Sequence, residues 1–85
     1  MYQLTYLKRA QKVLLAMPRT TALLIRDKLR QLALDPHVPN NNVTKLQGRE
    51  GYRLRVGDWR VIYEIHDDRL IVMVLDIGPR GGIYK

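Results

Sequence analysis

Two segments that alternate apolar and charged residues, separated by a Gly-Asp pair at 57–58, constrain the fold of this chain most strongly. The first segment spans 52–56 and the second spans 59–66. Glycine at the first central position of a two-residue turn is typical of a type II′ hairpin, so the pattern predicts two antiparallel strands. Such a turn also fixes the register, and it places Arg55 directly opposite Arg60.

The alternation divides the side chains of this hairpin between an apolar face and a cationic face. The apolar face carries Tyr52, Leu54, Val56, Trp59, Val61, Tyr63 and Ile65. The opposite face carries Arg53, Arg55 and Arg60 together with Glu64. Like charges directly opposite each other destabilise a sheet by about 0.2–1 kcal/mol, so this face predicts an anion-binding site. The alternative is that the long arginine side chains spread into solvent, with Glu64 offsetting their charge.

The N-terminal part predicts one strand followed by two helices. Residues 2–7 alternate loosely, as in a short strand. Apolar residues at helical spacing predict a helix over 8–17 and a second helix that is capped by Thr20 or Thr21 and runs to Leu34. The two apolar stripes, which we interpret as core, are Ala10, Val13, Leu14 and Met17, then Ala22, Ile25, Leu29, Leu32 and Ala33.

The remaining segments complete an α+β pattern. Residues 35–45 have the composition of a loop, and residues 69–77 predict a last strand, joined to the hairpin by a two-residue turn at 67–68. On this alternation Asp76 falls on the apolar face. The predicted order is β-α-α-β-β-β, with both helices on one face of a small, mainly antiparallel sheet. We expect residues 1–85 to form a single domain.

The composition favours a polyanionic partner. The chain has 15 Lys and Arg against 8 Asp and Glu, which gives a formal net charge of +7. It has no cysteine, which excludes disulfides and thiolate chemistry. Its apolar runs are far shorter than the roughly 20 residues of a membrane span, and they do not fit a signal peptide. We therefore expect a cytoplasmic protein that binds nucleic acid or an acidic protein rather than a membrane.

An ordered series of short motifs runs through the second half of the chain. They are Lys-Leu-Gln-Gly at 45–48, Tyr-Arg-Leu-Arg at 52–55, Gly-Asp-Trp-Arg at 57–60 followed by Val61-Ile62-Tyr63, Ile-Gly-Pro-Arg at 77–80, and Tyr84. The series resembles the RelE toxin family, the ribosome-dependent messenger-RNA endonucleases of bacterial type II toxin–antitoxin pairs. The two predicted helices fit the same family more loosely, so the resemblance covers essentially the whole chain.

The resemblance implies a translation-inhibiting hydrolase that cleaves messenger RNA in the ribosomal A site, without a metal ion or other cofactor. A ribose 2′-OH would attack the adjacent phosphate. The implied catalytic residues are Arg53, Arg55, Arg60, Arg80 and Tyr84. The implied RNA-binding residues are Lys45, Arg49, Arg53 and Arg55. Some relatives have lysines where this chain has Arg53 and Arg55, and arginine is a poor general base because it stays protonated. Tyr84 is then the matching proton carrier, with His66 as a second choice.

The implied partners are the ribosome, messenger RNA and a cognate acidic antitoxin that holds the toxin inactive. The toxin and antitoxin would form a hetero-oligomer that binds operator DNA through the antitoxin. Two alternatives stay open: a ParE-like relative that poisons DNA gyrase without nuclease activity, and a non-catalytic RNA- or ribosome-binding module. The basic residues at 53, 55, 60 and 80 with Tyr84 favour the nuclease, because gyrase poisons generally lack this set.

Overall fold

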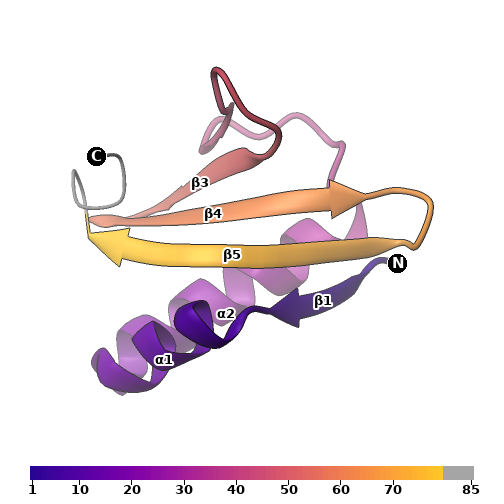
Figure 1. Cartoon of the computed structure of the whole chain (residues 1–85). Coiled ribbons are helices and arrows are strands. Elements are labelled where there is room, and N and C mark those ends of the chain that lie inside the picture. Colours follow the sequence, from indigo (N-terminus) through magenta and orange to yellow (C-terminus); the bar gives the residue numbers. More distant parts are fainter. Residues whose placement is uncertain (80–85) are drawn as a thin grey trace.

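The computed structural model describes residues 1–79, which form two helices and five strands (Figure 1). The elements are β1 (Gln3–Tyr6), α1 (Lys8–Ala16), α2 (Arg19–Leu34), β2 (Val43–Lys45), β3 (Tyr52–Val56), β4 (Trp59–His66) and β5 (Ile71–Pro79). The predicted α+β class is confirmed, and the bounds of the two hairpin strands are those that the sequence predicts. None of the described helices is long and apolar enough to cross a membrane.

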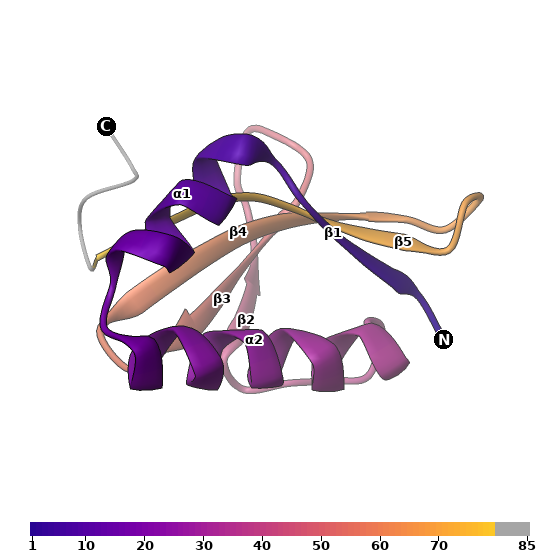
Figure 2. The ribbon, with the colours of Figure 1, turned by 90° about the horizontal axis from the view of Figure 1, so that it is seen from below.

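The five strands form one mixed sheet in the order β1-β5-β4-β3-β2. β1 is parallel to β5, and the other three pairs are antiparallel. Both helices cover the same face of the sheet, as Figure 2 shows from the helix side. α1 packs against β5, and α2 packs against β1 and β3. Neither of the two helices within residues 1–79 covers the opposite face of the sheet, which we call the outer face.

The core lies between the helices and the sheet, and both predicted helical stripes contribute to it. Its fully or almost fully buried members include Ala10, Leu14, Ile25, Leu29, Ala33, Leu54, Val61, Tyr63, Val72, Val74 and Ile77. Tyr63 stacks on Tyr52 with ring centroids 5.6 Å apart. Burial raises the pKa of Tyr63 far above its usual value, so this hydroxyl stays neutral within the core.

The hairpin has the register that its turn predicts. Val56 pairs with Trp59, Arg55 with Arg60, and Leu54 with Val61. Gly57 has φ +58°, a positive value that glycine adopts at little cost and that a type II′ turn requires at this position. The outer-face position of Arg55 and Arg60 thus follows from one turn and from the burial of Leu54 and Val61 on the other face.

Two predicted local features at the ends of elements are wrong. α2 begins at Arg19, because the carbonyl of Pro18 already accepts the N–H of Ala22 at 3.0 Å, and neither predicted threonine, Thr20 or Thr21, caps it. The connection from β4 to β5 spans four residues, 67–70, rather than two. Two backbone hydrogen bonds close this connection, one from the N–H of Arg69 to His66 and one from the N–H of Leu70 to Asp67.

Two further differences concern the sheet itself. Residues 43–45, predicted as loop, form the edge strand β2 and pair with β3. The register between β4 and β5 shifts at Ile62/Tyr63, so that Ile62 faces Asp76 and Tyr63 faces Val74. This β-bulge reverses the alternation of β5 and places Asp76 on the outer face, which corrects the prediction that it lies on the apolar face. The Asp76 carboxylate lies 3.7 Å from the guanidinium of Arg9.

Candidate nucleic-acid interface

Three of the arginines predicted from the sequence come together on the outer face, at the end of the sheet where the β3–β4 hairpin turns. Arg53 and Arg55 project from β3, and Arg60 projects from the start of β4. They surround a small cavity of about 130 Å³, which we call the arginine hollow. Its lining consists of Asn41, Asn42, Thr44, Arg53, Arg55 and Arg60. The hollow presents cationic and neutral hydrogen-bonding groups and almost no apolar surface.

Hydrogen bonds of the segment before β2 fix the neutral wall of the hollow. The carbonyl of Asn42 accepts the backbone N–H of Arg55 at 2.8 Å. The side-chain oxygen of Asn40 accepts the N–H of Asn42 at 2.9 Å. The backbone carbonyl of Asn40 accepts the N–H of Val43 at 3.1 Å. Thr44 is paired with Arg53 across the β2–β3 ladder. The asparagine segment is therefore held against the arginine strand before any ligand binds.

Two of the arginines of the hollow, Arg55 and Arg60, have no carboxylate partner within the described residues. Arg60 donates from Nη1 to the carbonyl oxygen of Trp59 at 3.3 Å, which orients its guanidinium group. Glu64, which would offset the positive charge under the alternative in which the arginines spread into solvent, contacts His66 at 3.1 Å. An anion with several oxygens would accept hydrogen bonds from these guanidinium groups, and such charge-assisted bonds are among the strongest in proteins.

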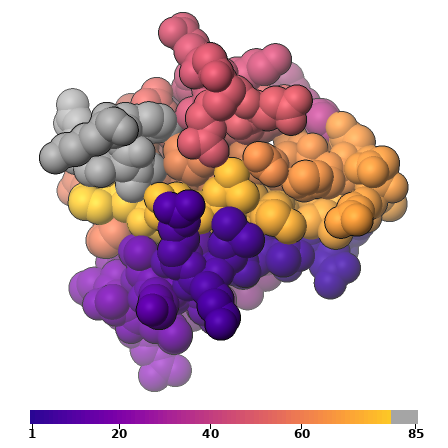
Figure 3. Space-filling model, viewed as in Figure 1, coloured from indigo at the N-terminus to yellow at the C-terminus, as the bar shows by residue number. Residues whose placement is uncertain are grey.

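The other predicted site residues lie elsewhere. Lys45 is opposite Tyr52 in the β2–β3 ladder, so it falls on the other parity of the strand from Arg53 and outside the hollow. Arg49 is exposed on the connection 46–51, which projects from the body of the molecule in Figure 3. Arg80 and Tyr84 lie outside the described residues. Roles for these four residues stay predictions.

The neutral wall of the hollow is not among the site residues that the sequence predicts. The sequence predicts only a loop at Asn41 and Asn42, and no role for Thr44. A signal was present, since Val43, Thr44 and Lys45 alternate as a strand does, and Thr44 then shares the face of the arginines. However, three alternating residues identify a strand only once their pairing with β3 is known.

Both histidines lie away from the hollow. Arg60 and His66 are near opposite ends of β4, which at about 3.3 Å per residue places them roughly 20 Å apart. His66 is therefore badly placed to act as a base there. Nε2 of His37 lies 2.6 Å from Oδ1 of Asp67, and the hydroxyl of Tyr2 donates to the same oxygen at 2.6 Å. This clasp joins the N-terminus, the segment after α2 and the β4–β5 connection.

Comparisons with known proteins agree with this fold. Residues 4–84 match the family model of the ParE toxin of the type II toxin–antitoxin system parDE. A chain of the RelE–RelB complex of the archaeon Pyrococcus horikoshii is 30% identical, with a TM-score of 0.82 and coverage of 95% of this chain and 97% of that chain. A chain of the intact RelBE complex of Escherichia coli is 24% identical, with a TM-score of 0.79 and coverage of 93% and 96%.

A curated relative points the same way. A RelE-like toxin protein of Escherichia coli is 28% identical over 53 residues, which is 62% of this chain and 56% of that relative. The aligned part thus spans just over half the length of the curated relative. Fold, family model and relatives define a toxin of a type II toxin–antitoxin system. The chain belongs to the RelE/ParE superfamily of such toxins, as its resemblance to the RelE family predicts.

The clasp generates a pH-dependent prediction for stability. The hydrogen bond from His37, followed by that from Tyr2, holds the pKa of Asp67 below its usual value. Because the carboxylate pKa is lower in the folded chain, its stabilisation is complete above about pH 4 and is lost as the pH falls through the folded-state pKa. We expect Asp67→Asn to lower the melting temperature at pH 7, and the difference from wild type to close in strong acid. Thermal unfolding followed by circular dichroism at several pH values measures this.

Asp68→Asn is the matched control, since Asp68 is the adjacent carboxylate of the same connection and makes neither hydrogen bond of the clasp. It should melt like wild type at every pH. Equal melting temperatures for Asp67→Asn and Asp68→Asn at pH 7 would contradict a stabilising role for the clasp.

Proposed function

We propose that this toxin is a metal-independent endoribonuclease that cleaves messenger RNA on the ribosome and thereby inhibits translation. The observation that supports this most strongly is the arginine hollow. Arg53, Arg55 and Arg60 converge on one small polar cavity, and the charges of Arg55 and Arg60 have no carboxylate partner within the described chain. A phosphodiester supplies the missing negative charge, and the amide and hydroxyl groups of the neutral wall suit the adjoining ribose.

The chemistry proposed is an internal transfer of the phosphoryl group. The ribose 2′-oxygen forms a bond to the adjacent phosphorus, and the bond from phosphorus to the 5′-oxygen of the next nucleotide breaks. The products are a 2′,3′-cyclic phosphate and a free 5′-hydroxyl. Negative charge grows on the phosphoryl oxygens in the transition state, where guanidinium groups fixed in advance stabilise it most. We assign this role to Arg53, Arg55 and Arg60, and propose that Arg80 shares it.

This reaction also moves two protons. One leaves the attacking 2′-hydroxyl, and one reaches the departing 5′-oxygen. The arginines stay protonated and are poor bases, and the asparagine and threonine side chains of the hollow do not titrate in the physiological range. His66 lies roughly 20 Å from Arg60 along β4. We therefore assign the proton transfer to Tyr84.

Dependence on the ribosome fits the open form of the site. The hollow is small and lies on the sheet face that neither described helix covers, so it offers little surface with which to orient a flexible RNA strand. A ribosome that presents the codon in a fixed conformation would supply this orientation. The exposed connection 46–51 with Arg49, and the neighbouring Lys45, are proposed as further contacts to RNA. This activity places the protein in the cytoplasm.

A second candidate is inhibition of DNA gyrase, as in ParE toxins. The observation that favours it is the match of the family model over residues 4–84. The arginine hollow favours the nuclease, because a protein that acts by binding gyrase has no evident need for three guanidinium groups that converge on one small polar cavity. The family assignment fits both candidates, so the site must distinguish them.

We further propose that an acidic antitoxin neutralises the toxin. Two of the solved relatives are chains of complexes with RelB. Leu15, Leu23 and Leu24 are 74%, 53% and 48% exposed on the helices, and Lys and Arg residues flank them. An acidic segment with apolar side chains would complement this surface, and such segments commonly fold as they bind. The antitoxin would also carry the complex to its operator DNA.

The arginine hollow gives the main prediction for activity. We expect Arg60→Gln to reduce cleavage on programmed ribosomes by about 10²–10³-fold, the loss typical of removing one preorganised donor. The melting temperature should change little, because relief of the repulsion between Arg55 and Arg60 offsets lost packing. Primer extension on the messenger RNA measures cleavage as codon-phased 5′ ends.

Arg69→Gln is the matched control, since it removes one exposed arginine from the β4–β5 connection, and it should cleave like wild type. Wild-type cleavage by a folded Arg60→Gln protein would contradict the proposed site. Gyrase-linked DNA breaks with intact messenger RNA would instead establish the ParE activity.

The antitoxin proposal predicts binding that depends on charge. Affinity for the proposed acidic antitoxin should fall as salt rises, mainly through slower association, because charge complementarity steers encounter. Surface plasmon resonance at several salt concentrations measures both rates. An association rate that does not change with salt would contradict an electrostatic partner.

A further inference from the structure

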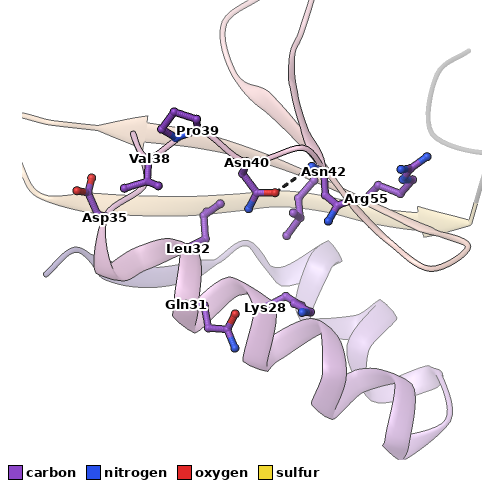
Figure 4. Close-up of a pocket in the computed structure, with 10 residues that line it drawn as sticks. Lys28, Gln31, Leu32, Asp35, Val38, Pro39, Asn40, Asn42 and Arg55 are labelled. Atoms are coloured by element: carbon purple, nitrogen blue, oxygen red, sulfur yellow. Dashed lines mark hydrogen bonds between the residues drawn. The ribbon is translucent and has the colours of Figure 1, made fainter.

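We propose that a second cavity, beside the arginine hollow, binds one unstacked nucleobase of the RNA. The cavity lies between α2 and the segment 38–42, which runs back toward the sheet (Figure 4). This inference rests on the proposed function, since it identifies a subsite for the same substrate. The volume of the cavity is about 290 Å³, at the lower limit of pockets that hold small ligands. We call it the base cavity.

The base cavity combines apolar surface with polar groups at its rim. Its lining consists of Lys28, Gln31, Leu32, Asp35, Val38, Pro39, Asn40, Asn42, Leu54 and Arg55. Leu32 and Leu54 are 7% and 3% exposed and form its floor, and Val38 and Pro39 add apolar surface. A flat base has two apolar faces and a polar edge, so it is suited to this mixture. Proteins that read single-stranded RNA place bases in surroundings of this kind.

Two hydrogen bonds hold the side chains of Asn40 and Asp35 at the rim. The side-chain oxygen of Asn40 accepts the N–H of Asn42, and Figure 4 shows the amide nitrogen of Asn40 directed toward α2. The Asp35 carboxylate accepts the N–H of His37 at 3.3 Å. The rim therefore offers an amide donor from Asn40 and a carboxylate acceptor from Asp35, while the amide nitrogen of Gln31 donates to the Asp27 carboxylate at 3.5 Å. The edges of bases carry donors and acceptors side by side, and such groups can pair with both.

The two cavities share residues, which is the strongest reason to assign them to one ligand. Arg55 and Asn42 line both the base cavity and the arginine hollow. The backbone of these two residues is joined by the 2.8 Å hydrogen bond from the N–H of Arg55 to the carbonyl of Asn42. A phosphate in the hollow therefore lies next to the mouth of the base cavity. Lys28 and Arg55 outweigh the charge of Asp35 at the rim, so a polyanion is not repelled.

Nuclear magnetic resonance can locate the ligand on the wild-type protein. We expect nucleoside monophosphates to shift the methyl signals of Leu32, Val38 and Leu54 together with the side-chain signals of the hollow arginines. Inorganic phosphate should shift the arginine signals alone. Arginine shifts without methyl shifts for all four nucleotides would overturn the base cavity and leave the phosphate site standing.

A variant that fills the cavity tests its role in the reaction. Gln31→Trp places a large side chain at an exposed position of α2 on the rim. Thr20→Trp is the matched control, since Thr20 lies about three turns earlier on the same helix, is also exposed and does not line the cavity. Cleavage on programmed ribosomes would be measured with messenger RNAs that carry one abasic nucleotide at each position around the cut.

We expect one abasic position to reduce cleavage by wild type and by Thr20→Trp about 5- to 100-fold more than cleavage by Gln31→Trp, because filling the cavity already removes that contact. Equal sensitivity of all three proteins at every position would overturn the inference while cleavage itself upholds the proposed function. Absence of cleavage by wild type would instead reject the proposed function. Weaker binding of the acidic antitoxin by Gln31→Trp, with unchanged abasic sensitivity, would assign the cavity to a protein ligand and overturn the inference.

Discussion

The pairing of Arg55 with Arg60 across the β3–β4 hairpin is the constraint on which the site depends. The two-residue turn at Gly57 sets this register, and burial of Leu54 and Val61 on the helix side keeps it. A slip of one residue would exchange the two faces and expose the core side chains to water. The same interactions that stabilise the core therefore force two guanidinium groups together on the outer face.

This arrangement is unfavourable for a sheet and useful for a site. Like charges opposite each other cost about 0.2–1 kcal/mol, and no carboxylate within residues 1–79 neutralises Arg55 or Arg60. Hydrogen bonds through Asn40 and Asn42 hold the neutral wall beside them. Local conflicts of this kind are expected where a protein keeps a functional site at the expense of stability. The structure thus accounts for an anion site formed by residues of β3, β4 and the segment before β2.

Features set by neighbouring residues could be predicted from the sequence, whereas those set by distant pairing could not. The hairpin register followed from one turn, and the core stripes of both helices followed from their period. The edge strand β2 was missed because the polar run that ends at Asn42 has the composition of a loop, and only pairing with β3 makes 43–45 a strand. Asp76 was misplaced because a β-bulge has no clear signature in the sequence. The neutral wall of the site depends on β2 and was missed with it.

Membership of the RelE/ParE superfamily establishes a toxin, and the arginine hollow is what favours RNA cleavage within that class. The most direct test of whether the arginine hollow binds phosphate is a comparison of thermal unfolding between wild type and the Arg55→Gln/Arg60→Gln double variant. Both proteins are measured with and without a low concentration of inorganic phosphate at constant ionic strength. If the arginines are held together to bind phosphate, the double variant should melt at or above the temperature of wild type without phosphate. Phosphate should then stabilise wild type alone. A double variant that melts well below wild type, with an equal response of both proteins to phosphate, would contradict this account.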